Sequence, residues 1–383
     1  MHKNLDFTIF SSTKEFPENW NNLAVNNIFL TKEYLTVLEL SPPKNMICNY
    51  IGVFKNNKLV GIALSQFLDL NKLESFGERD KCIKAAVRKF IFKNYSSHVL
   101  FIGNNMLSGQ NAYCFSNEIE FDDFFTALKL ASEKLALDFK NQGKKIHLLN
   151  FKDFNSDDSE KFNINLLKEH YQFNTQPNMV FEIPEEWNSE ADYINVLHKK
   201  YRDQYKRARK KCVGIVKRKL NLQEIKDNQE TIYDLYFHVA KNAPFNTFFL
   251  AKNHFSVFKE QLKDNFLFYG YFENDKLIGF NTLIKNGRAM DTYFLGYDDT
   301  IQREKMLYLN MLYDMICYSI KKGYKEIVFA RTALEIKSSV GAKPINMYGF
   351  MKHTNKLIDK NISKIFKYLE PKVEWNQRNP YKN

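Results

Sequence analysis

The chain has 383 residues, of which 44% are hydrophobic and 15% aromatic, so it can fill more than one core, which argues against disorder. Its net charge of +12 suits anionic partners, such as a phosphorylated cofactor, nucleic acid or an acidic membrane surface. Five scattered cysteines without a CxxC pair argue against a disulfide framework or a zinc site. Neither a secretory signal pattern nor an apolar run of ~18 residues is present. We therefore expect a cytoplasmic protein that can touch the inner membrane face peripherally.

Two pairs of similar segments recur in the same order along the chain. "FLTKEYLTVL" (29–38) resembles "FLAKNHFSVF" (249–258), which lies 220 residues later (249 − 29). "YIGVFKNNKLVG" (50–61) resembles "FYGYFENDKLIG" (268–279), which lies 218 residues later (279 − 61). Each member of the second pair is typical of two strands around a turn of Asn and Asp residues. Two ordered matches at nearly one offset indicate an internal duplication.

The two copies also agree downstream of these matches. In each, a long amphipathic helix stops at a glycine, Gly143 or Gly323, and a strand follows, at 146–151 or 326–330. The second long helix is predicted to run without interruption from residue 302. We predict an α/β (α+β) fold of two tandem domains, each a mixed twisted sheet flanked by helices, with the boundaries 1–165 and 166–383.

A basic helix is predicted near 192–212, where the second copy opens. Apolar and tyrosine side chains share one of its faces, from Leu197 to Cys212. Basic side chains form a stripe on another face, made of Lys199, Arg202, Lys206 and Arg209. Two interpretations stay open for this stripe, a solvated charged helix or a surface that binds anions or a membrane.

The segment "FARTALEIKSSVGAKP" (329–344) gathers charged residues just past the predicted strand 326–330. A short solvated helix and a turn would explain it, because acidic residues are favoured in the first turn of a helix. Another candidate is Asp291 in "AMDTYFLGYD", because Asp is intrinsically disfavoured in strands. On a regular strand Asp291, Tyr293 and Leu295 share one face.

With these elements in order, the chain resembles tandem acyltransferases of the GNAT superfamily. The basic helix is similar to that of Fem-type transferases. The segment 329–344 is similar to one in a bacterial predicted N-acyltransferase group that includes bacterial ceramide synthases, whose conserved positions would be Glu335, Lys337, Gly341 and Pro344. Ile336 and Val340 stand where that group usually has histidine and commonly has arginine. The glycine-containing pyrophosphate loop of the superfamily is also missing from "TIQREKMLYLN" (300–310).

The resemblance implies an N-acyltransferase that joins a thioester-borne acyl group to an amine. The donor would be acyl-CoA or acyl carrier protein, and the acceptor an envelope or lipid precursor such as a sphingoid-like amino lipid. Glu335 would be the first candidate for the base and Asp291 the second, and Tyr293 would act as the acid for the departing thiolate. Anion contacts would come from Arg331, Lys337, Lys343, Arg202, Lys206 and Arg209, and contacts to the donor diphosphate from Arg303 and Lys305. No permanently bound cofactor and no metal are expected.

Two other functions stay open. One is a Fem-type transferase that moves an aminoacyl group from tRNA to a peptidoglycan precursor. The other is a non-catalytic basic protein that binds RNA or membranes on a decayed acyltransferase fold, which the missing glycines favour. The first copy is expected to be catalytically silent, because "NFKDFNSDDSEKF" (150–162) lacks the Arg-x-x-x-Glu-x-Lys spacing.

Overall fold

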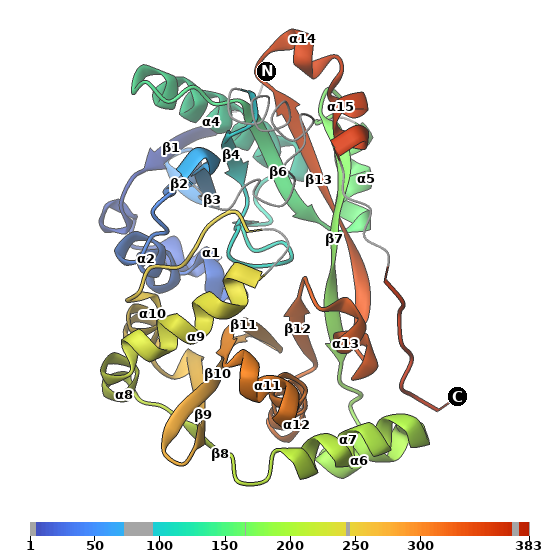
Figure 1. The fold of residues 1–383 in the computed structure, drawn as a ribbon. Helices are drawn as coiled ribbons and strands as arrows, with labels where there is room; N and C mark the ends of the chain where they lie inside the picture. The colour runs from blue at the N-terminus through green and yellow to red at the C-terminus, as the bar shows by residue number, and fades with distance from the viewer. Residues whose placement is uncertain (1–4, 73–94, 165, 243–245, 370–374, 383) are drawn as a thin grey trace, which may run out of the picture. The chain divides into compact units, whose positions relative to one another are not determined.

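The structure is a computed structural model, and it describes residues 5–72, 95–164, 166–242, 246–369 and 375–382 (Figure 1). The chain divides into two compact units. The first unit contains Met1–Thr175, Thr247–Ala251 and Asn346–Lys372. The second contains Gln176–Asn246, Lys252–Ile345 and Val373–Asn383.

The first unit is built on a mixed sheet in the order β1-β2-β3-β4-β6-β13, with β5 paired to β3. Its strands are β1 (Leu5–Phe10), β2 (Met46–Lys55), β3 (Lys58–Asp69), β4 (His98–Ile102), β5 (Tyr113–Phe115), β6 (Leu148–Phe154) and β13 (Lys343–His353). Strands β4 and β6 run parallel, and the other pairs are antiparallel. Hydrophobic residues alternate with polar residues along β1, as expected for an edge strand with one buried face.

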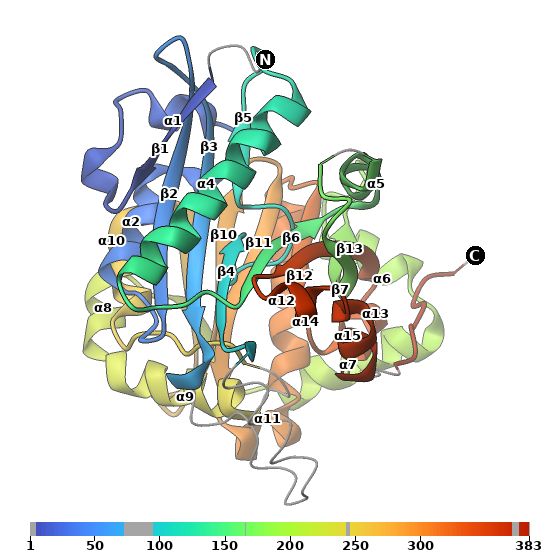
Figure 2. The same cartoon turned by 90° about the horizontal axis from the view of Figure 1, so that it is seen from above.

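A long helix, α4 (Phe121–Asn141), crosses the β1–β3 side of this sheet (Figure 2). Phe124, Leu128 and Leu135 face the sheet and are at most 3% exposed, which gives the helix the apolar stripe that its periodicity predicts. The remaining helices of the unit are α1 (Trp20–Leu23), α2 (Lys32–Leu40), α5 (Ser156–Ile164), α14 (Lys356–Asp359) and α15 (Ile362–Leu369), with short 3-10 turns at Thr13–Glu15, Ile28–Leu30 and Leu70–Lys72.

The second unit has a mixed sheet in the order β7-β12-β11-β10-β9-β8. Its strands are β7 (Tyr171–Glu182), β8 (Val216–Lys219), β9 (Phe266–Glu273), β10 (Lys276–Asn286), β11 (Ala289–Tyr297) and β12 (Glu326–Ala330). Its helices are α6 (Glu190–Val196), α7 (Lys199–Lys211), α8 (Leu222–Asp227), α9 (Gln229–Asn242), α10 (His254–Leu262), α11 (Asp299–Lys305), α12 (Leu307–Lys321) and α13 (Leu334–Ser339), with a 3-10 turn at Lys263–Asn265.

Two apolar layers cover the faces of this second sheet. One is formed by α12 with α6 and α7, where Met311, Tyr313 and Ile316 are at most 1% exposed. The other carries aromatic rings from α9 and α10 against β9 and β10, including Phe255 against Phe280 with centroids 5.1 Å apart. The many phenylalanines of the sequence therefore contribute to core packing.

The structure confirms the duplication that the sequence predicts. The turns Asn56-Asn57 and Asn274-Asp275 both have two residues with positive φ, as a type I′ hairpin turn requires. Each hairpin also has a β-bulge three residues after the second turn residue (60 − 57 and 278 − 275), at Val60 in β3 and Ile278 in β10, again 218 residues apart (278 − 60). A shared turn is common among hairpins, but a shared bulge at the same position indicates common descent of the two copies.

The two units are not contiguous in the sequence, which differs from the expected division at residue 165. The chain after α5 enters the second unit, where Phe181 of β7 pairs with Ile327 of β12. The chain after α13 enters the first unit, where Phe350 of β13 pairs with Phe151 of β6. Each copy therefore contributes the strand that completes the sheet of the other. The described residues 346–369 pack with the first unit although they belong to the second copy.

Within the described part of the chain, no helix combines the length and the apolar character that crossing a bilayer requires.

Candidate active site

The described strands of the second unit include one parallel pair, β11 and β12, and this pair diverges toward its carboxyl ends. Their ladder joins Ala289–Asp291 to Glu326–Val328 and stops there, while β11 continues to Tyr297. Thr292 Oγ1 donates a hydrogen bond to the Val328 carbonyl at 3.0 Å, just past the last ladder pair. Ligands of open α/β sheets bind outside the carboxyl ends of parallel strands. The carboxyl ends of β11 and β12 are therefore the candidate active site.

The chain leaves β12 through a strained turn. Ala330, Thr332 and Ala333 have φ values of 60°, 70° and 46°, which non-glycine residues rarely adopt. Such conformations persist only where the surrounding structure holds them, and they cluster at functional sites. The turn leads into α13, which is one and a half turns long and carries Glu335 and Lys337.

The side chain of Lys337 stabilises this turn by hydrogen bonds to its carbonyl oxygens. Its side chain is 5% exposed, and its Nζ donates hydrogen bonds to the carbonyl oxygens of Arg331 at 2.6 Å and Ala330 at 3.3 Å. Burial lowers the pKa of Lys337 to about 7. Burial likewise lowers the pKa of Arg331 to about 10. The sequence predicted Lys337 as an anion contact, and the structure gives it carbonyl partners within its own turn.

Glu335 is held by the C-terminal segment of the chain. Its carboxylate accepts hydrogen bonds from the Asn376 backbone at 3.2 Å and from the Arg378 guanidinium at 3.1 Å. These two contacts hold the pKa of Glu335 below its ordinary value. Arg378 also donates its backbone N–H to Ser338 Oγ at 3.0 Å. In the structure, the Glu335 carboxylate therefore links residues 376–378 to α13. Its lowered pKa makes it a weak base.

Asp291 lies at the last ladder pair between β11 and β12, opposite Val328. It is 4% exposed and accepts a hydrogen bond from Asn286 Nδ2 at 3.2 Å. Burial raises the pKa of Asp291 to about 7 against the opposing effect of that hydrogen bond, and the charge of Glu326 adds to the rise. A carboxyl group with a pKa near 7 can exchange a proton at physiological pH.

Tyr293 is paired with a histidine that sequence reasoning missed. Its hydroxyl lies 3.0 Å from Nε2 of His254, which is fully buried at the start of α10, and the two rings stack. The repeat carried a signal for this residue, because it aligns His254 with Tyr34 of the first copy. Asn104 Nδ2 donates to Tyr34 Oη at 2.9 Å, just after β4. In the second copy, α10 of the first match is thus joined to β11, and in the first copy α2 is joined to the residues that follow β4.

The expected common face of Asp291, Tyr293 and Leu295 is wrong. Leu283 pairs with Thr292, and Asn281 pairs with Leu295, so Tyr293 and Phe294 together oppose the single residue Thr282. This bulge in β11 changes the alternation of side chains and turns Leu295 to the opposite face.

The basic side chains that were predicted to form one stripe on α7 lie in different environments in the structure. Tyr201, Tyr205 and Ala208 are buried, as predicted, and Lys206 is exposed. Arg209 points inward, where its Nη1 lies 2.6 Å from Asp314 Oδ1 and its Nη2 lies 3.0 Å from Glu190 Oε1. Burial alone would lower the pKa of Arg209, but Asp314 and the hydrogen bond that Arg209 donates to the Tyr205 hydroxyl raise it.

The remaining candidate cations lie on the surface. Lys343 forms an exposed ion pair with Glu182 at 3.1 Å, and Lys305 pairs with Glu273 at 3.0 Å. Arg202 Nη1 donates to the Leu197 carbonyl at 2.9 Å. Arg303 is exposed on α11.

The long helix predicted from residue 302 is interrupted, which corrects the expectation of one continuous helix. Met306 adopts a left-handed conformation (φ 50°, ψ 42°) between α11 and α12. No side chain caps the N-terminus of α12, so main-chain N–H groups of its first turn point toward the end of α11. Lys305 directly precedes this break.

The equivalent point of the first unit carries a buried ion pair. The β4–β6 ladder ends at Ile102 and Phe151, and the next residue, Lys152, places Nζ 2.7 Å from Asp153 Oδ2. Both side chains are at most 7% exposed, and Lys152 also donates to the Asn104 carbonyl at 2.9 Å. Asp153 has a φ of 67°, so this turn is strained like that of the second copy. The silence of the first copy stays a prediction.

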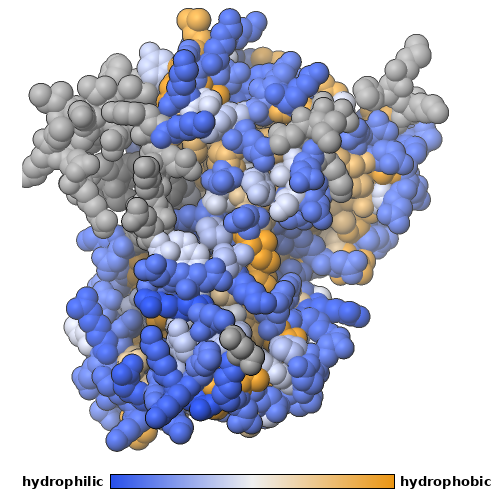
Figure 3. All heavy atoms as spheres, turned by 90° about the vertical axis from the view of Figure 1, so that its right-hand side faces the viewer, coloured by the Kyte–Doolittle hydropathy of each residue, from blue (hydrophilic) through white to orange (hydrophobic). Residues whose placement is uncertain are grey.

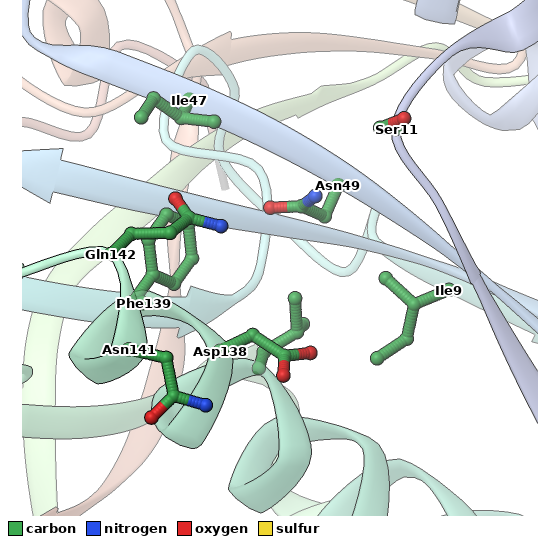
Figure 4. A pocket seen from close by; sticks show the side chains of 9 residues that line it. Ile9, Ser11, Ile47, Asn49, Asp138, Phe139, Asn141 and Gln142 are labelled. Carbon is green, nitrogen blue, oxygen red and sulfur yellow. The ribbon is translucent and has the colours of Figure 1, made fainter.

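The first unit also has a hollow of about 500 Å³ between β1, β2 and the C-terminal end of α4 (Figure 4). Ile9 and Phe139 contribute apolar walls, and the amides of Asn49 and Gln142 lie at its rim. It lies beside the edge strand and not at the carboxyl ends of the parallel pair β4 and β6. We assign no chemistry to it.

Two solved structures share this architecture over nearly the whole chain. FemX has a TM-score of 0.53 at 10% identity, and the match covers 96% of this chain and 100% of that chain. A tandem GNAT protein from the clavulanic acid biosynthesis pathway has a TM-score of 0.50 at 8% identity, covering 92% and 99%. No protein-family model and no curated protein sequence matches the chain. At these identities the likeness establishes the fold, and the predicted tandem GNAT fold is confirmed.

Proposed function

We propose that this protein is an N-acyltransferase that forms an amide between a thioester-borne acyl group and an amine. The observation that carries the proposal is the position of Asp291. It lies where two parallel strands of a GNAT fold begin to diverge, and it is buried with a pKa near 7. General bases work best when their pKa is close to the operating pH, and burial tunes a carboxyl group in this direction.

In the proposed reaction the amine nitrogen attacks the thioester carbonyl carbon, so that a C–N bond forms and the C–S bond breaks. Asp291 accepts the proton that the amine loses. Tyr293 donates its hydroxyl proton to the departing thiolate, and His254 orients that hydroxyl through the 3.0 Å contact. Lys337 acts indirectly, because its bonds to Ala330 and Arg331 keep the strained turn at the end of β12 in place.

The donor is proposed to be acyl-CoA or acyl carrier protein. The uncapped N-terminus of α12 offers backbone N–H groups to a phosphate, and the helix dipole favours negative charge there. Arg303 and Lys305 stand in the last turn of α11, just before this end in the sequence, and Lys305 would have to exchange Glu273 for the phosphate. Side chains would thus replace the glycine loop that the sequence lacks. The acceptor is proposed to be the amine of an envelope or lipid precursor.

A Fem-type reaction is the second candidate, because FemX is similar in fold over the whole chain. The bond formed at the amine would be the same, but the acyl group would arrive on tRNA. A basic protein suits either donor, so charge does not decide between them.

The experiment is a transfer assay with the purified full-length chain. Labelled palmitoyl-CoA, palmitoyl acyl carrier protein or aminoacyl-tRNA is supplied in separate reactions with an envelope lipid extract. A labelled product that withstands mild alkali, as amides do and esters do not, supports the proposal. Transfer from aminoacyl-tRNA alone would establish the Fem-type alternative. No transfer from any donor, with vesicle or RNA binding intact, would establish the non-catalytic alternative.

A further inference from the structure

The outer face of α7 carries a dense group of exposed cations. At about 100° per residue, they occupy an arc of about 140° around the helix axis. Asp203 is the acidic residue within this arc. The exposed cations are Lys199, Lys200, Lys206, Arg207, Lys210 and Lys211.

The buried opposite face of α7 determines that this arc of cations points outward. Tyr201, Tyr205 and Ala208 are at most 9% exposed and pack in the core of the second unit. Arg209 is neutralised by Glu190 and Asp314 on the inner side. The exposed cations therefore stay on the surface with a constant orientation, and the lower part of the face in Figure 3, where α6 and α7 lie in Figure 1, is covered by hydrophilic side chains.

Two exposed valines follow the cationic arc directly. Val213 is 75% exposed in the turn after α7, and Val216, the first residue of β8, is 60% exposed. The turn passes through Gly214 with a φ of 90°, a conformation that suits glycine. Branched apolar side chains gain nothing from contact with water, and no described residue covers these two valines, which follow the exposed Lys210 and Lys211.

We propose that the exposed cations of α7 together with Val213 and Val216, here called the basic apex, dock on the surface of an anionic lipid bilayer. Cations near a membrane are attracted by anionic headgroups, and adjacent apolar side chains can enter the boundary between headgroups and acyl chains. This inference concerns the second unit's outer surface and stands whether or not the chain transfers acyl groups.

A membrane fits this surface better than a nucleic acid does. Proteins that hold single-stranded nucleic acid present aromatic rings on which bases stack. The tyrosines of α7, Tyr201 and Tyr205, are buried, and the exposed arc and turn offer cations and aliphatic side chains. Valines are suited to an acyl-chain boundary and contribute nothing to phosphate binding.

The test is sedimentation of the full-length chain with vesicles. Vesicles of 30 mol% phosphatidylglycerol in phosphatidylcholine are expected to bind the protein, and pure phosphatidylcholine is expected to bind it weakly. The double variant Lys210→Glu/Lys211→Glu should weaken binding roughly tenfold or more, because each basic residue near the surface contributes separately. Val213→Ser/Val216→Ser should weaken it at equal salt, although it leaves every charge in place.

A matched control is available in the same unit. Lys321 and Lys322 are also adjacent exposed lysines at the C-terminal end of a helix, so Lys321→Glu/Lys322→Glu changes the net charge equally. Its vesicle binding should match that of the unaltered protein. The proposal would be overturned by equal losses in both charge variants, which would indicate net charge alone. It would also be overturned if the valine variant bound normally, or if the apex lysines affected the binding of tRNA but not of vesicles.

Discussion

The ammonium nitrogen of Lys337 lies 2.6 Å from the carbonyl oxygen of Arg331, six residues earlier in the chain. The carbonyl belongs to a turn in which Ala330, Thr332 and Ala333 have positive φ values. A buried lysine that bonds to carbonyl oxygens is costly, because its charge is taken out of water. That cost is offset where the bond fixes a strained turn at the end of a strand.

Replacing Lys337 by methionine should destabilise the protein by about 2 kcal/mol, because two partly buried carbonyl oxygens lose their donor. Urea unfolding followed by circular dichroism measures this change. Lys343→Met, in the same segment but in an exposed ion pair, should alter the free energy of unfolding by no more than about 0.5 kcal/mol. If the Lys337 variant were as stable as the Lys343 variant, the turn would not depend on this side chain.

Lys337 should also affect how the free energy of unfolding depends on pH. Its pKa is about 7 in the folded chain, against an ordinary value of 10.5. Between these two values the unfolded chain holds one more proton than the folded chain, so this lysine makes stability rise as pH rises from 7 to 10.5. The difference in unfolding free energy between wild type and Lys337→Met should therefore increase over this window. A difference independent of pH would contradict the low pKa.

Gly341→Ala should release the C-terminal segment from α13. Gly341 has a φ of 108°, and a Cβ there would lie 1.8 Å from the hydroxyl oxygen of Tyr381. Tyr381 contacts Trp187, and the neighbouring Pro380 accepts a hydrogen bond from the His198 backbone at 2.8 Å. Limited proteolysis should cut the C-terminal segment of the alanine variant faster than that of wild type. Gly323→Ala, where a Cβ meets nothing within 4 Å, controls for backbone strain alone.

Arg209 is expected to be structural. Arg209→Met removes the cation from Glu190 and leaves Asp314 with Lys217 alone, at 3.4 Å, so it should cost about 2 kcal/mol of unfolding free energy. Lys206→Met, one turn earlier and exposed, should cost no more than about 0.5 kcal/mol. Equal effects of the two substitutions in thermal unfolding would mean that the half-buried ion network of Arg209 does not stabilise the fold.

The architecture of each copy could be predicted from local sequence, because hairpin turns, helix stops and the apolar face of α7 depend on neighbouring residues. The exchange of β7 and β13 could not, because a strand's pattern does not identify its partner in the sheet. The bulge that turns Leu295 away from Asp291 was hidden for the same reason. The break at Met306 was hidden because methionine is a good helix former and gives no sign of a left-handed conformation.

Individual candidate residues were harder to predict than the fold. The sequence shows that a residue is charged but not which residue it pairs with. Glu335 and Arg209 were therefore predicted at the site, whereas the structure gives them ion pairs within the protein. His254 was overlooked because its importance depends on Tyr293, 39 residues away in the chain. Asp291 was singled out because an aspartate is unusual inside a strand, and its burial agrees with that signal.

The most direct test of the central claim is the pH dependence of acyl transfer in wild type and in Asp291→Asn. If Asp291 is the base, the wild-type rate at saturating substrates should rise tenfold per pH unit below about pH 7 and level off above it. The asparagine variant should be at least about a hundredfold slower, while Asp227→Asn, an exposed surface change, should match wild type. Transfer by Asp291→Asn at the wild-type rate and with the wild-type pH profile would contradict the account.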